Sequence, residues 1–519
     1  MRKNLSALSI ALSLCAALAL PIGLSAQELK PQKEEKKEHH HYQLIDMGTF
    51  GGPNSFSPTP GYPSYGVLNN RGTLVGLADT STPDPLCFFD CYVTHAFQWQ
   101  NGVTTDLGVL AGGPISFAIW ISASGLIAGV SQNGQIDPLS GFPELRAVLW
   151  QNGGITDLGT LPEGGYESYT SAVNSRGQVV GFAANTVPDP NAMLPLGYQT
   201  RAFLWDKQKG MQDLGTLPSG TNAEAGLINE EGQVVGWSYT SSAPSAFCAS
   251  GYGFPLTTGS FIWDEENGMK DLGSLGGTCT VAYDLNNRGQ VVGQSTLTGD
   301  KAAHPFVWDP ATGLTDPGTL GGDFASAFAI NDYGEAVGGS YLPGDLQVDA
   351  VLWRKSAGKW QKTDLGTVGS ANCSYGISVN ASGQVAGDSG ADCNTLAFLW
   401  EDGGPMVDLN TLVSSNSGIH VAEAVNINDR GEIAVTGVDV DGNAHAVLLI
   451  PCDENHADVE GCDYGLIEPV IGAPVRPPQV TQAPAASPAK LSPAEMMTRF
   501  QSLRAGRNRR FGTPQTSPQ

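Results

Sequence analysis

Eight aspartates recur along the chain, each followed two residues later by glycine or asparagine. They are Asp46, Asp106, Asp157, Asp213, Asp271, Asp316, Asp364 and Asp408. Carboxylates can serve as general acids, general bases or metal ligands, but a catalytic group is needed once, at one place. Eight copies instead predict anchors that accept backbone hydrogen bonds in turns.

A second set of candidate residues consists of aromatic side chains in segments that differ from one repeat to the next. An aromatic ring on an exposed loop can stack on a sugar or anchor a protein partner, so we take these rings as the candidate ligand-binding residues. The alternative is that they pack on one another and stiffen the loops. The candidates are Phe88, Phe89, Tyr92, Phe142, Tyr198, Phe247, Tyr252 and Phe254.

Other reactive motifs are missing from the sequence. It contains no glycine-rich phosphate loop, no zincin motif and no Gly-x-Ser-x-Gly elbow. Residues 439–443 resemble the start of a calcium loop but lack its sixth-position glycine and terminal acid, so a hairpin turn explains them more simply. His39, His40 and His41 could hold a metal loosely, or belong to a disordered spacer. We expect no catalytic residue, no cofactor and no metal.

These residues sit in a unit of about fifty residues that occurs eight times. Each unit contains an apolar strand, an Asn-x-x-Gly turn, a second strand, a variable loop, an Ala-Phe-x-Trp strand and an Asp-Leu-Gly element. The turn glycines are Gly72, Gly125, Gly177, Gly232, Gly289, Gly334, Gly383 and Gly431, separated by 53, 52, 55, 57, 45, 49 and 48 residues. The tryptophans are Trp99, Trp150, Trp205, Trp263, Trp308, Trp353 and Trp400, with Leu449 in the last unit. We expect them to pack between units.

Each element has a local physical reason. In Asn174-Ser175-Arg176-Gly177 the Asn side chain caps the turn, and glycine takes the left-handed position that lets the chain reverse. Residues 202–205 are apolar on both alternating faces, so the strand must be covered on both sides, as in stacked sheets. Four short strands per unit predict an all-β fold, namely a β-propeller with one four-stranded blade per unit.

The two ends of the repeat predict how the propeller closes. A strand of the Asp-Leu-Gly type, residues 42–48, precedes the first complete unit, and the last unit, residues 422–451, lacks one. The N-terminal strand is therefore expected to complete the last blade and remove the free edges. We predict eight four-stranded blades. Seven blades, if the irregular second unit packs differently, and a β-solenoid are the alternatives.

The loops between the second and third strands are long only in the first four units. They span about residues 78–94, 131–146, 183–200 and 239–259. In an antiparallel blade these loops share one face with the connection to the next blade, and the other two turns lie opposite. The candidate aromatic residues all lie in these loops, so we expect binding on this face.

The cysteine spacing predicts disulfides. We expect Cys87–Cys91, Cys248–Cys279, Cys373–Cys393 and Cys452–Cys462 from proximity in the sequence, although eight cysteines allow many other connectivities. A zinc site is the competing interpretation, but no CxxC motif or nearby histidine pair accompanies these residues.

The N-terminus has the pattern of a secretory signal peptide over residues 1–26. Arg2 and Lys3 precede an apolar run, and small residues end at Ser25-Ala26. Export makes disulfides possible, and no later stretch is apolar enough to span a bilayer. We expect a soluble monomer that is secreted to the extracellular space or the periplasm. The formal net charge of −24 excludes a nucleic-acid partner for the body, because phosphates would be repelled.

Composition divides the remainder of the chain into short segments around the repeat. We expect a charged spacer at 27–41, the repeat region at 42–451, a disulfide hairpin at 452–468 and a Pro/Ala-rich linker at 469–491. Residues 492–519 begin like a capped helix and carry several arginines. They predict a short basic amphipathic helix and tail that could dock on an acidic partner.

The repeated motifs together resemble the HAF family of bacterial extracellular repeat proteins, named for a His-Ala-Phe tripeptide. His95-Ala96-Phe97 matches it fully, and His304-Pro305-Phe306 and His445-Ala446-Val447 nearly so. The resemblance covers about residues 42–451 and implies export and a repeated β fold, but no reaction. A required ligand would not vary as the histidine does. Other units have Arg146, Arg201, Ser260, Asp349 and Leu396 in its place.

The sequence therefore favours an exported, non-catalytic scaffold that binds a glycan, an envelope component or another protein. One alternative is a propeller enzyme, a polysaccharide hydrolase or lyase, with its acids in the central channel. An unrepeated pair of carboxylates near the axis with raised pKa values would favour that enzyme. A purely structural surface protein is the other alternative.

Overall fold

The computed structural model of the protein describes residues 38–57, 66–85, 91–193, 197–390, 396–401, 403–414, 416–457 and 459–467. The expected signal peptide, the linker and the C-terminal helix lie outside the described residues, as do Cys87, Phe88, Phe89 and Cys393. The described residues form strands β1 to β34, one α-helix and two 3-10 helices. The all-β prediction is thus confirmed.

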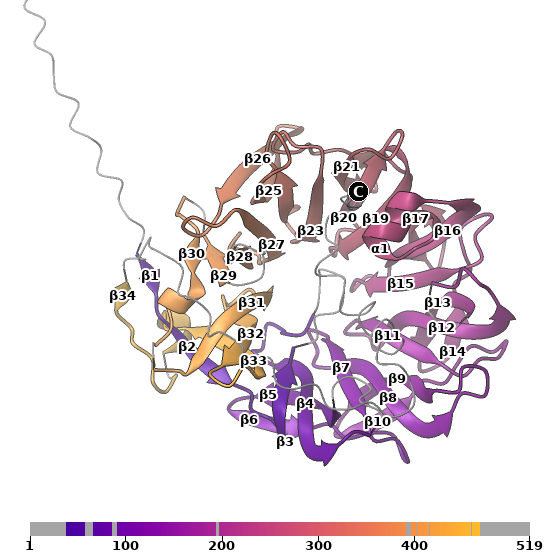
Figure 1. Cartoon of the computed structure of the whole chain (residues 1–519), viewed down its shortest axis with the longest axis horizontal. Helices are drawn as coiled ribbons and strands as arrows, with labels where there is room; N and C mark the ends of the chain where they lie inside the picture. Colours follow the sequence, from indigo (N-terminus) through magenta and orange to yellow (C-terminus); the bar gives the residue numbers. More distant parts are fainter. Residues whose placement is uncertain are drawn as a thin grey trace, which may run out of the picture. The chain divides into compact units, whose positions relative to one another are not determined.

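All strands except β1 and β34 fall into antiparallel groups of four (Figure 1). The first three groups are β3 (Gly51–Phe56), β4 (Leu74–Pro83), β5 (Tyr92–Gln100) and β6 (Val103–Asp106); β7 (Ser116–Ile121), β8 (Ile127–Ile136), β9 (Pro143–Gln151) and β10 (Gly154–Asp157); and β11 (Ser168–Val173), β12 (Val179–Pro188), β13 (Tyr198–Asp206) and β14 (Gly210–Asp213). Each group corresponds to one repeat of the sequence.

The next four groups contain the only α-helix of the described residues, α1 (Ala246–Tyr252), and the 3-10 helix η1 (Leu409–Thr411). Their strands are β15 (Ala223–Ile228), β16 (Val234–Pro244), β17 (Leu256–Asp264) and β18 (Gly268–Asp271); β19 (Gly276–Leu285), β20 (Val291–Leu297), β21 (Ala303–Asp309) and β22 (Gly313–Thr315); β23 (Ala325–Ile330), β24 (Ala336–Tyr341), β25 (Val348–Ser356) and β26 (Lys359–Gly366); and β27 (Cys373–Val379), β28 (Val385–Gly390), β29 (Leu396–Trp400) and β30 (Val407–Asp408).

The last group combines strands from the two ends of the repeat region. It contains β31 (Ile419–Ile427), β32 (Ile433–Asp439), β33 (Ala444–Pro451) and the N-terminal strand β2 (Tyr42–Asp46), in the order β2-β33-β32-β31. Strand β2 pairs antiparallel with β33 from Tyr42↔Pro451 to Asp46↔Val447. The N-terminal strand therefore lies where the order of the sequence elements predicts it.

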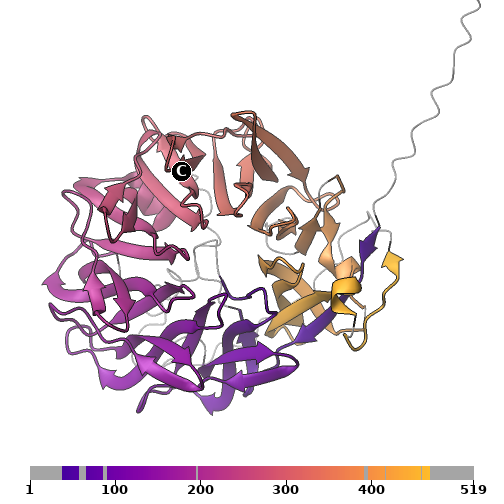
Figure 2. The same cartoon turned by 180° about the vertical axis from the view of Figure 1, so that it is seen from behind.

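Neighbouring groups pack against each other in chain order. The second strand of one group contacts the first strand of the next, as β4 contacts β7 and β28 contacts β31, and β33 contacts β3 of the first group (Figures 1 and 2). Single parallel residue pairs, Thr258↔Cys279 and Val348↔Cys373, join two pairs of groups into eight-stranded sheets.

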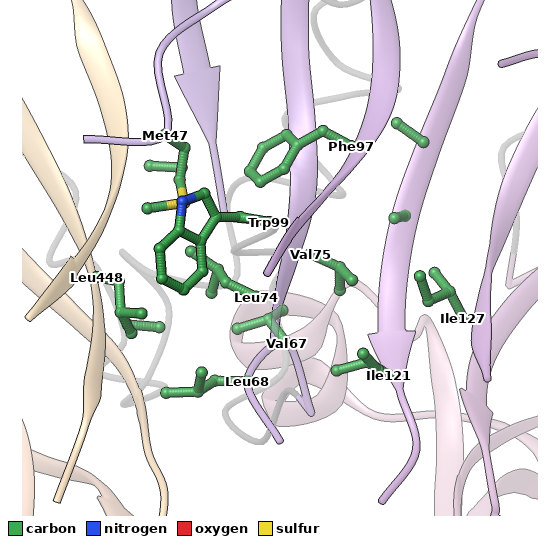
Figure 3. Close-up of a cluster of buried hydrophobic side chains, with 14 of the residues drawn as sticks. Met47, Val67, Leu68, Leu74, Val75, Phe97, Trp99, Ile121, Ile127 and Leu448 are labelled. Atoms are coloured by element: carbon green, nitrogen blue, oxygen red, sulfur yellow. The ribbon is translucent and has the colours of Figure 1, made fainter. Parts of the chain in front are cut away.

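Apolar side chains from three groups meet between the sheets, as Figure 3 shows for one cluster. Leu448 of β33, Leu74 and Trp99 of the first group, and Ile121 and Ile127 of the second all belong to it. The predicted packing of Trp99 between units is confirmed. In the third strands one phenylalanine position is fully buried in five groups, at Phe97, Phe203, Phe261, Phe306 and Phe398. These strands are covered on both faces, as their composition predicts.

The Asn-x-x-Gly turns join the first and second strands, and their seven buried asparagines also link their own group to the next. Asn286 Oδ1 accepts the N–H groups of Arg288 at 3.1 Å and Gln290 at 2.9 Å, which confirms the predicted cap. Its Nδ2 donates to the backbone carbonyl of Asn331 in the following group at 3.0 Å. We call this series of donor links the asparagine ladder. Its other members are Asn69 to Ser122, Asn174 to Asn229, Asn229 to Asn286, Asn331 to Asn380, Asn380 to Asn428, and Asn428 to Asn69.

The Asp-Leu-Gly elements turn the chain at the end of the fourth strand. In all eight copies the aspartate Oδ1 accepts the backbone N–H two residues later, at 2.7–2.9 Å. The predicted role of these aspartates as turn anchors is confirmed.

The segments that flank the repeat are ordered where the structure describes them. Strand β1 (His39–His40) pairs with β34 (Leu466–Ile467), and His39 is buried beside Glu401, with 2.9 Å between Nδ1 and Oε2. The expected spacer therefore ends before His39 and not at His41. The Cys452–Cys462 disulfide encloses the 3-10 helix η2 (Glu454–His456), which replaces the expected simple hairpin.

Ser122 replaces asparagine in the second unit, which provides a test of the asparagine ladder. Its hydroxyl accepts the Leu126 N–H at 3.0 Å, as an asparagine oxygen would, but serine has no amide to donate to the Asn174 carbonyl. We predict that Ser122→Asn supplies this donor and raises the free energy of unfolding by about 1 kcal/mol. Urea denaturation checks this value.

The matched control is Asn286→Ala, which removes the ladder donor and leaves buried N–H groups without their acceptor. It should lower the free energy of unfolding by about 1–3 kcal/mol. Equal stabilities of wild type and Asn286→Ala would show that the ladder contributes nothing.

Candidate functional site

The longest predicted binding loop folds into a compact cap. Helix α1 begins after Ser245, whose hydroxyl accepts the Cys248 N–H at 3.2 Å, and ends at Gly253 in the left-handed conformation, with φ 78°. The disulfide Cys248–Cys279, with the Cα atoms 5.6 Å apart, ties this helix to β19 of the next group. The loop is held by covalent and capping interactions.

Two of the candidate aromatic residues are core residues of this cap. Phe247 is 7 % exposed and stacks on Phe324 with ring centroids 6.4 Å apart, and Phe254 is 3 % exposed and lies 6.2 Å from Trp237. Both belong to an apolar cluster that reaches Tyr375. Their expected contact with a ligand is therefore corrected: these rings stiffen the loop, as the alternative interpretation held.

The remaining aromatic candidates have different surroundings. Tyr92, Phe142 and Tyr198 are half-buried, and a role for them in binding stays a prediction. The Tyr252 side chain, Phe88 and Phe89 lie outside the described residues. Cys91 and Cys373 are disulfide-bonded, but their expected partners, Cys87 and Cys393, also lie outside the described part of the chain.

The histidines of the His-Ala-Phe motif pair with the aspartates of the adjacent fourth strand. His95 Nδ1 lies 2.8 Å from Asp106, and His304 Nδ1 lies 2.7 Å from Asp316. His445 joins β33 to Asp46 of β2 at 3.1 Å, and Arg201 makes the equivalent contact to Asp213 at 2.9 Å. In these four groups the side chain at the variable position therefore links the third strand to the fourth, a structural role that arginine also fills, whereas Arg146 pairs with Glu144.

The pKa values of these groups follow the same geometry. Burial acts to raise the pKa of Asp106, but hydrogen bonds from His95 and the Gly108 N–H outweigh it and leave the pKa below its ordinary value. The hydrogen bond that His445 donates to the carboxylate of Asp46 raises the pKa of His445. Asp349, which occupies the histidine position in the sixth group, has a raised pKa because it is buried and faces Asp364.

One buried carboxyl group stands out near the aromatic cluster. Glu224 on β15 is 3 % exposed, and the Trp237 Nε1 donates to its Oε2 at 3.1 Å. Burial raises the pKa of Glu224 to about 7, although the Trp237 hydrogen bond opposes this shift. The repeat has no acid at the matching position of the third and fifth groups, which hold Tyr169 and Val281. The eighth group holds an acid at this position, Glu423, so Glu224 is distinguished by its burial and raised pKa and not by being unrepeated.

A groove opens on the opposite face from the long loops, between the fifth and sixth groups. It has a volume of about 630 Å³ and is lined by turn residues such as Arg288 and Tyr333 and by the β25–β26 hairpin. At its turn end that hairpin extends two residue pairs further than the β17–β18 hairpin, because Lys355↔Trp360 and Ser356↔Lys359 follow Arg354↔Gln361. The extension builds one wall of the groove.

The groove collects residues that depart from the repeat. Tyr333 is 70 % exposed and occupies the third position of its Asn-x-x-Gly turn, where Arg288 stands in the previous unit. Arg354 follows the repeated tryptophan, where other units have acids or glutamine, such as Asp309 and Gln100. Trp360 lies on the extra hairpin length. By the argument applied to the aspartates, side chains found once are the better candidates for function.

The charges in the groove are arranged by local hydrogen bonds. Arg354 Nε lies 2.6 Å from Glu335 Oε1, and Gln290 Nε2 donates to Asp309 at 2.8 Å. The pKa of Asp309 is lowered, most strongly by the hydrogen bond from the Ala311 N–H and to a lesser extent by the Gln290 hydrogen bond and the charge of Lys355. Both carboxylates therefore already have hydrogen-bond donors.

The sequence reasoning missed this groove because it searched the long loops of the opposite face. Its signals were present as departures from the repeat: tyrosine in a turn that elsewhere carries Arg, Ser or Glu, and an unrepeated tryptophan after Lys359. What brings Tyr333 and Trp360 together with Arg288 is the packing of two groups.

No group of three or more His, Cys, Asp or Glu side chains is placed to hold a metal ion within the part of the chain that the structure describes. In residues 439–443 the Asp439 Oδ1 accepts the N–H groups of Asp441 and Asn443, each at 2.8 Å. These residues form the turn between β32 and β33. Among the described residues no helix is long and apolar enough to cross a membrane.

Glu224 predicts a pH-dependent stability. Its raised pKa means that the folded state holds the proton more tightly than the unfolded state. The stabilisation of the folded state by this bound proton is complete below pH 4.5 and is lost as the pH rises through about 7. Glu224→Gln should therefore unfold at higher urea than wild type at pH 8, by on the order of 3 kcal/mol, since one pKa unit corresponds to about 1.4 kcal/mol.

The two proteins should have nearly equal stability at pH 4.5, and the exposed control Glu231→Gln should leave the pH profile unchanged. A wild type that is as stable at pH 8 as Glu224→Gln would contradict the assigned environment.

No protein-family model and no curated protein matches the sequence. Several solved structures are similar in fold. The β-propeller domain of the Trilobed protease from Pyrococcus furiosus has 12 % identity and a TM-score of 0.38, covering 68 % of this chain and 96 % of that one. A puromycin-hydrolysing peptidase of Mycobacterium tuberculosis has 11 % identity and a TM-score of 0.41, covering 76 % and 62 %. A prolyl endopeptidase has 9 % identity and a TM-score of 0.39, covering 78 % and 51 %. The likeness concerns the fold alone.

Proposed function

We propose that this chain is an exported, non-catalytic β-propeller of eight four-stranded blades that serves as a binding scaffold for a glycan, an envelope component or a protein. The groups of four strands and the pairing of β2 with β33 support eight blades closed by the N-terminal strand. The hydrogen bond from Asn428 to Asn69 supports the same closure, because it is the asparagine-ladder link, formed here between the last unit and the first.

Export and family membership are part of this proposal. The disulfides Cys248–Cys279 and Cys452–Cys462 suit an oxidising compartment, and the signal-like residues 1–26 suit secretion. The tripeptide, turn and Asp-Leu-Gly motifs support membership of the HAF family, with the histidines acting as structural charge partners.

The observation that carries the binding function is the concentration of unrepeated side chains at one groove. A repeated scaffold holds Tyr333 on a turn that Asn331 caps, and Arg354 and Trp360 on the paired strands β25 and β26. Binding residues tend to lie on such segments, because a rigid support lowers the entropy lost when a ligand is bound.

A propeller enzyme is the second candidate, and Glu224 is the observation that favours it. A carboxyl group with a pKa of about 7 could exchange a proton near neutral pH. Its 3 % exposure places it beneath other side chains, so catalysis would require the aromatic cluster to open. We rank this function second for that reason.

Co-sedimentation with polysaccharides and isolated envelope fragments tests the proposed function. We expect residues 27–519 to be retained by at least one of these materials without releasing new reducing or unsaturated sugar ends. A heat-unfolded sample is the control for non-specific retention.

If the wild type releases sugar ends and Glu224→Gln does not, the scaffold function would be rejected in favour of the enzyme. Failure to bind any glycan, envelope fragment or envelope protein would remove the binding function and favour a structural role.

A further inference from the structure

We propose that the groove between the fifth and sixth groups binds an anionic sugar chain, with its carboxylate or sulfate on Arg288 and Lys355 and its ring faces on Tyr333 and Trp360. This inference rests on the proposed binding function and deepens it, since it names the site and the ligand class. It also moves the site to the face opposite the long loops.

Two aromatic side chains, Tyr333 and Trp360, line the groove. Tyr333 is 70 % exposed on a turn, and Trp360 is half-buried in the extended hairpin. Both line the same groove. Flat, partly apolar rings gain free energy when they are covered, and the C–H faces of a pyranose ring match them in shape and polarity. A fully polar ion or a small metal would leave these rings uncovered.

Charged side chains of both signs also line the groove. The lining contains three cations, Arg288, Arg354 and Lys355, and two carboxylates, Asp309 and Glu335. Both carboxylates are engaged, Glu335 by Arg354 at 2.6 Å and Asp309 by Gln290 at 2.8 Å. An entering anion therefore meets the guanidinium of Arg288 and the ammonium of Lys355, and guanidinium in particular binds carboxylate and sulfate oxygens through paired hydrogen bonds.

The contrast with the rest of the chain strengthens the assignment. The formal net charge is −24, with only 27 Lys and Arg residues in the sequence, yet Arg288, Arg354, Lys355, Lys359 and Lys362 gather around one hairpin and turn. An acidic molecule repels a dense polyanion such as nucleic acid. A short acidic sugar chain carries far fewer charges than a nucleic acid and can place one anion at this local positive region.

The groove is also positioned before a ligand arrives. Lys355 Nζ lies 5.5 Å from the centroid of the Trp360 ring, so the cation and the aromatic wall are adjacent. Arg288 Nη2 donates to Gln290 at 3.1 Å and lies close to Gly334, where a Cβ atom would come within 2.8 Å of it. The volume of about 630 Å³ falls in the usual range for small-ligand sites, about 300–1,000 Å³.

Isothermal titration calorimetry on residues 27–519 tests the proposal with four probes. These are an oligogalacturonate, a sulfated galactan oligomer, a neutral galactan oligomer and poly-glutamate. We expect binding of the carboxylated or the sulfated sugar, the first two probes identifying which, and at least tenfold weaker binding of the neutral sugar. Raising the salt concentration should weaken the anionic interaction.

Substitutions localise the interaction. Lys355→Gln combined with Arg288→Gln should raise the Kd at least tenfold, and so should Tyr333→Ala, whose exposed side chain is not needed for folding. Lys270→Gln is the matched control, because Lys270 lies 5.3 Å from the centroid of the Trp308 ring but does not line the groove. It should leave the Kd unchanged.

Binding of a glycan or envelope fragment that these groove variants do not weaken would overturn this inference and leave the proposed scaffold function intact. Equal binding of poly-glutamate would overturn it in favour of an acidic peptide, and equal binding of the neutral sugar would overturn the charge argument. No binding of any material by the wild type would remove both proposals.

Discussion

The rest of the structure depends on the buried asparagine carboxamide in each Asn-x-x-Gly turn. Its oxygen closes the turn by accepting two N–H groups, and its nitrogen donates to the equivalent turn of the next group. One side chain thus sets both the local bend and the spacing between neighbours. The sequence separation across this link varies from 45 to 57 residues while its length stays near 3 Å. The loops can therefore differ in length without moving the strands that the asparagines join. Breaking the asparagine link would leave a buried amide unsatisfied, which costs more free energy than closing a longer loop.

This division explains how the two faces differ. The long loops add covering structure: α1 and the Cys248–Cys279 disulfide bury aromatic rings over the inner strands. The opposite face consists of short turns, where a longer hairpin and a changed turn residue are enough to create a groove. Small departures on a rigid repeat have large consequences, because the surrounding backbone does not adjust to them.

Electrostatics follow the same plan of repeated pairs with local exceptions. In four groups the histidine or arginine near the start of the third strand pairs with the aspartate of the fourth, which links the two strands of the hairpin and, through His445 and Asp46, links β33 to β2. Where Asp349 replaces the histidine, two carboxyl groups face each other and the pKa of Asp349 rises. In the groove, Arg354 stands where other units have an acid, and it forms an ion pair with Glu335.

The amino-acid sequence was enough to predict the strands, the turn caps of Asn286 and its counterparts, the anchoring aspartates and the position of β2. These features depend on interactions within a few residues or on the order of elements, which a sequence displays directly. It also paired Cys248 with Cys279 correctly. Three features became visible only in the folded chain: Phe247 and Phe254 are buried, His39–His40 forms a strand with Leu466–Ile467, and Arg288, Tyr333 and Trp360 share one groove. Burial and proximity of this kind arise from packing between separate groups, and nothing in the local residue pattern specifies which side chains that packing covers or brings together.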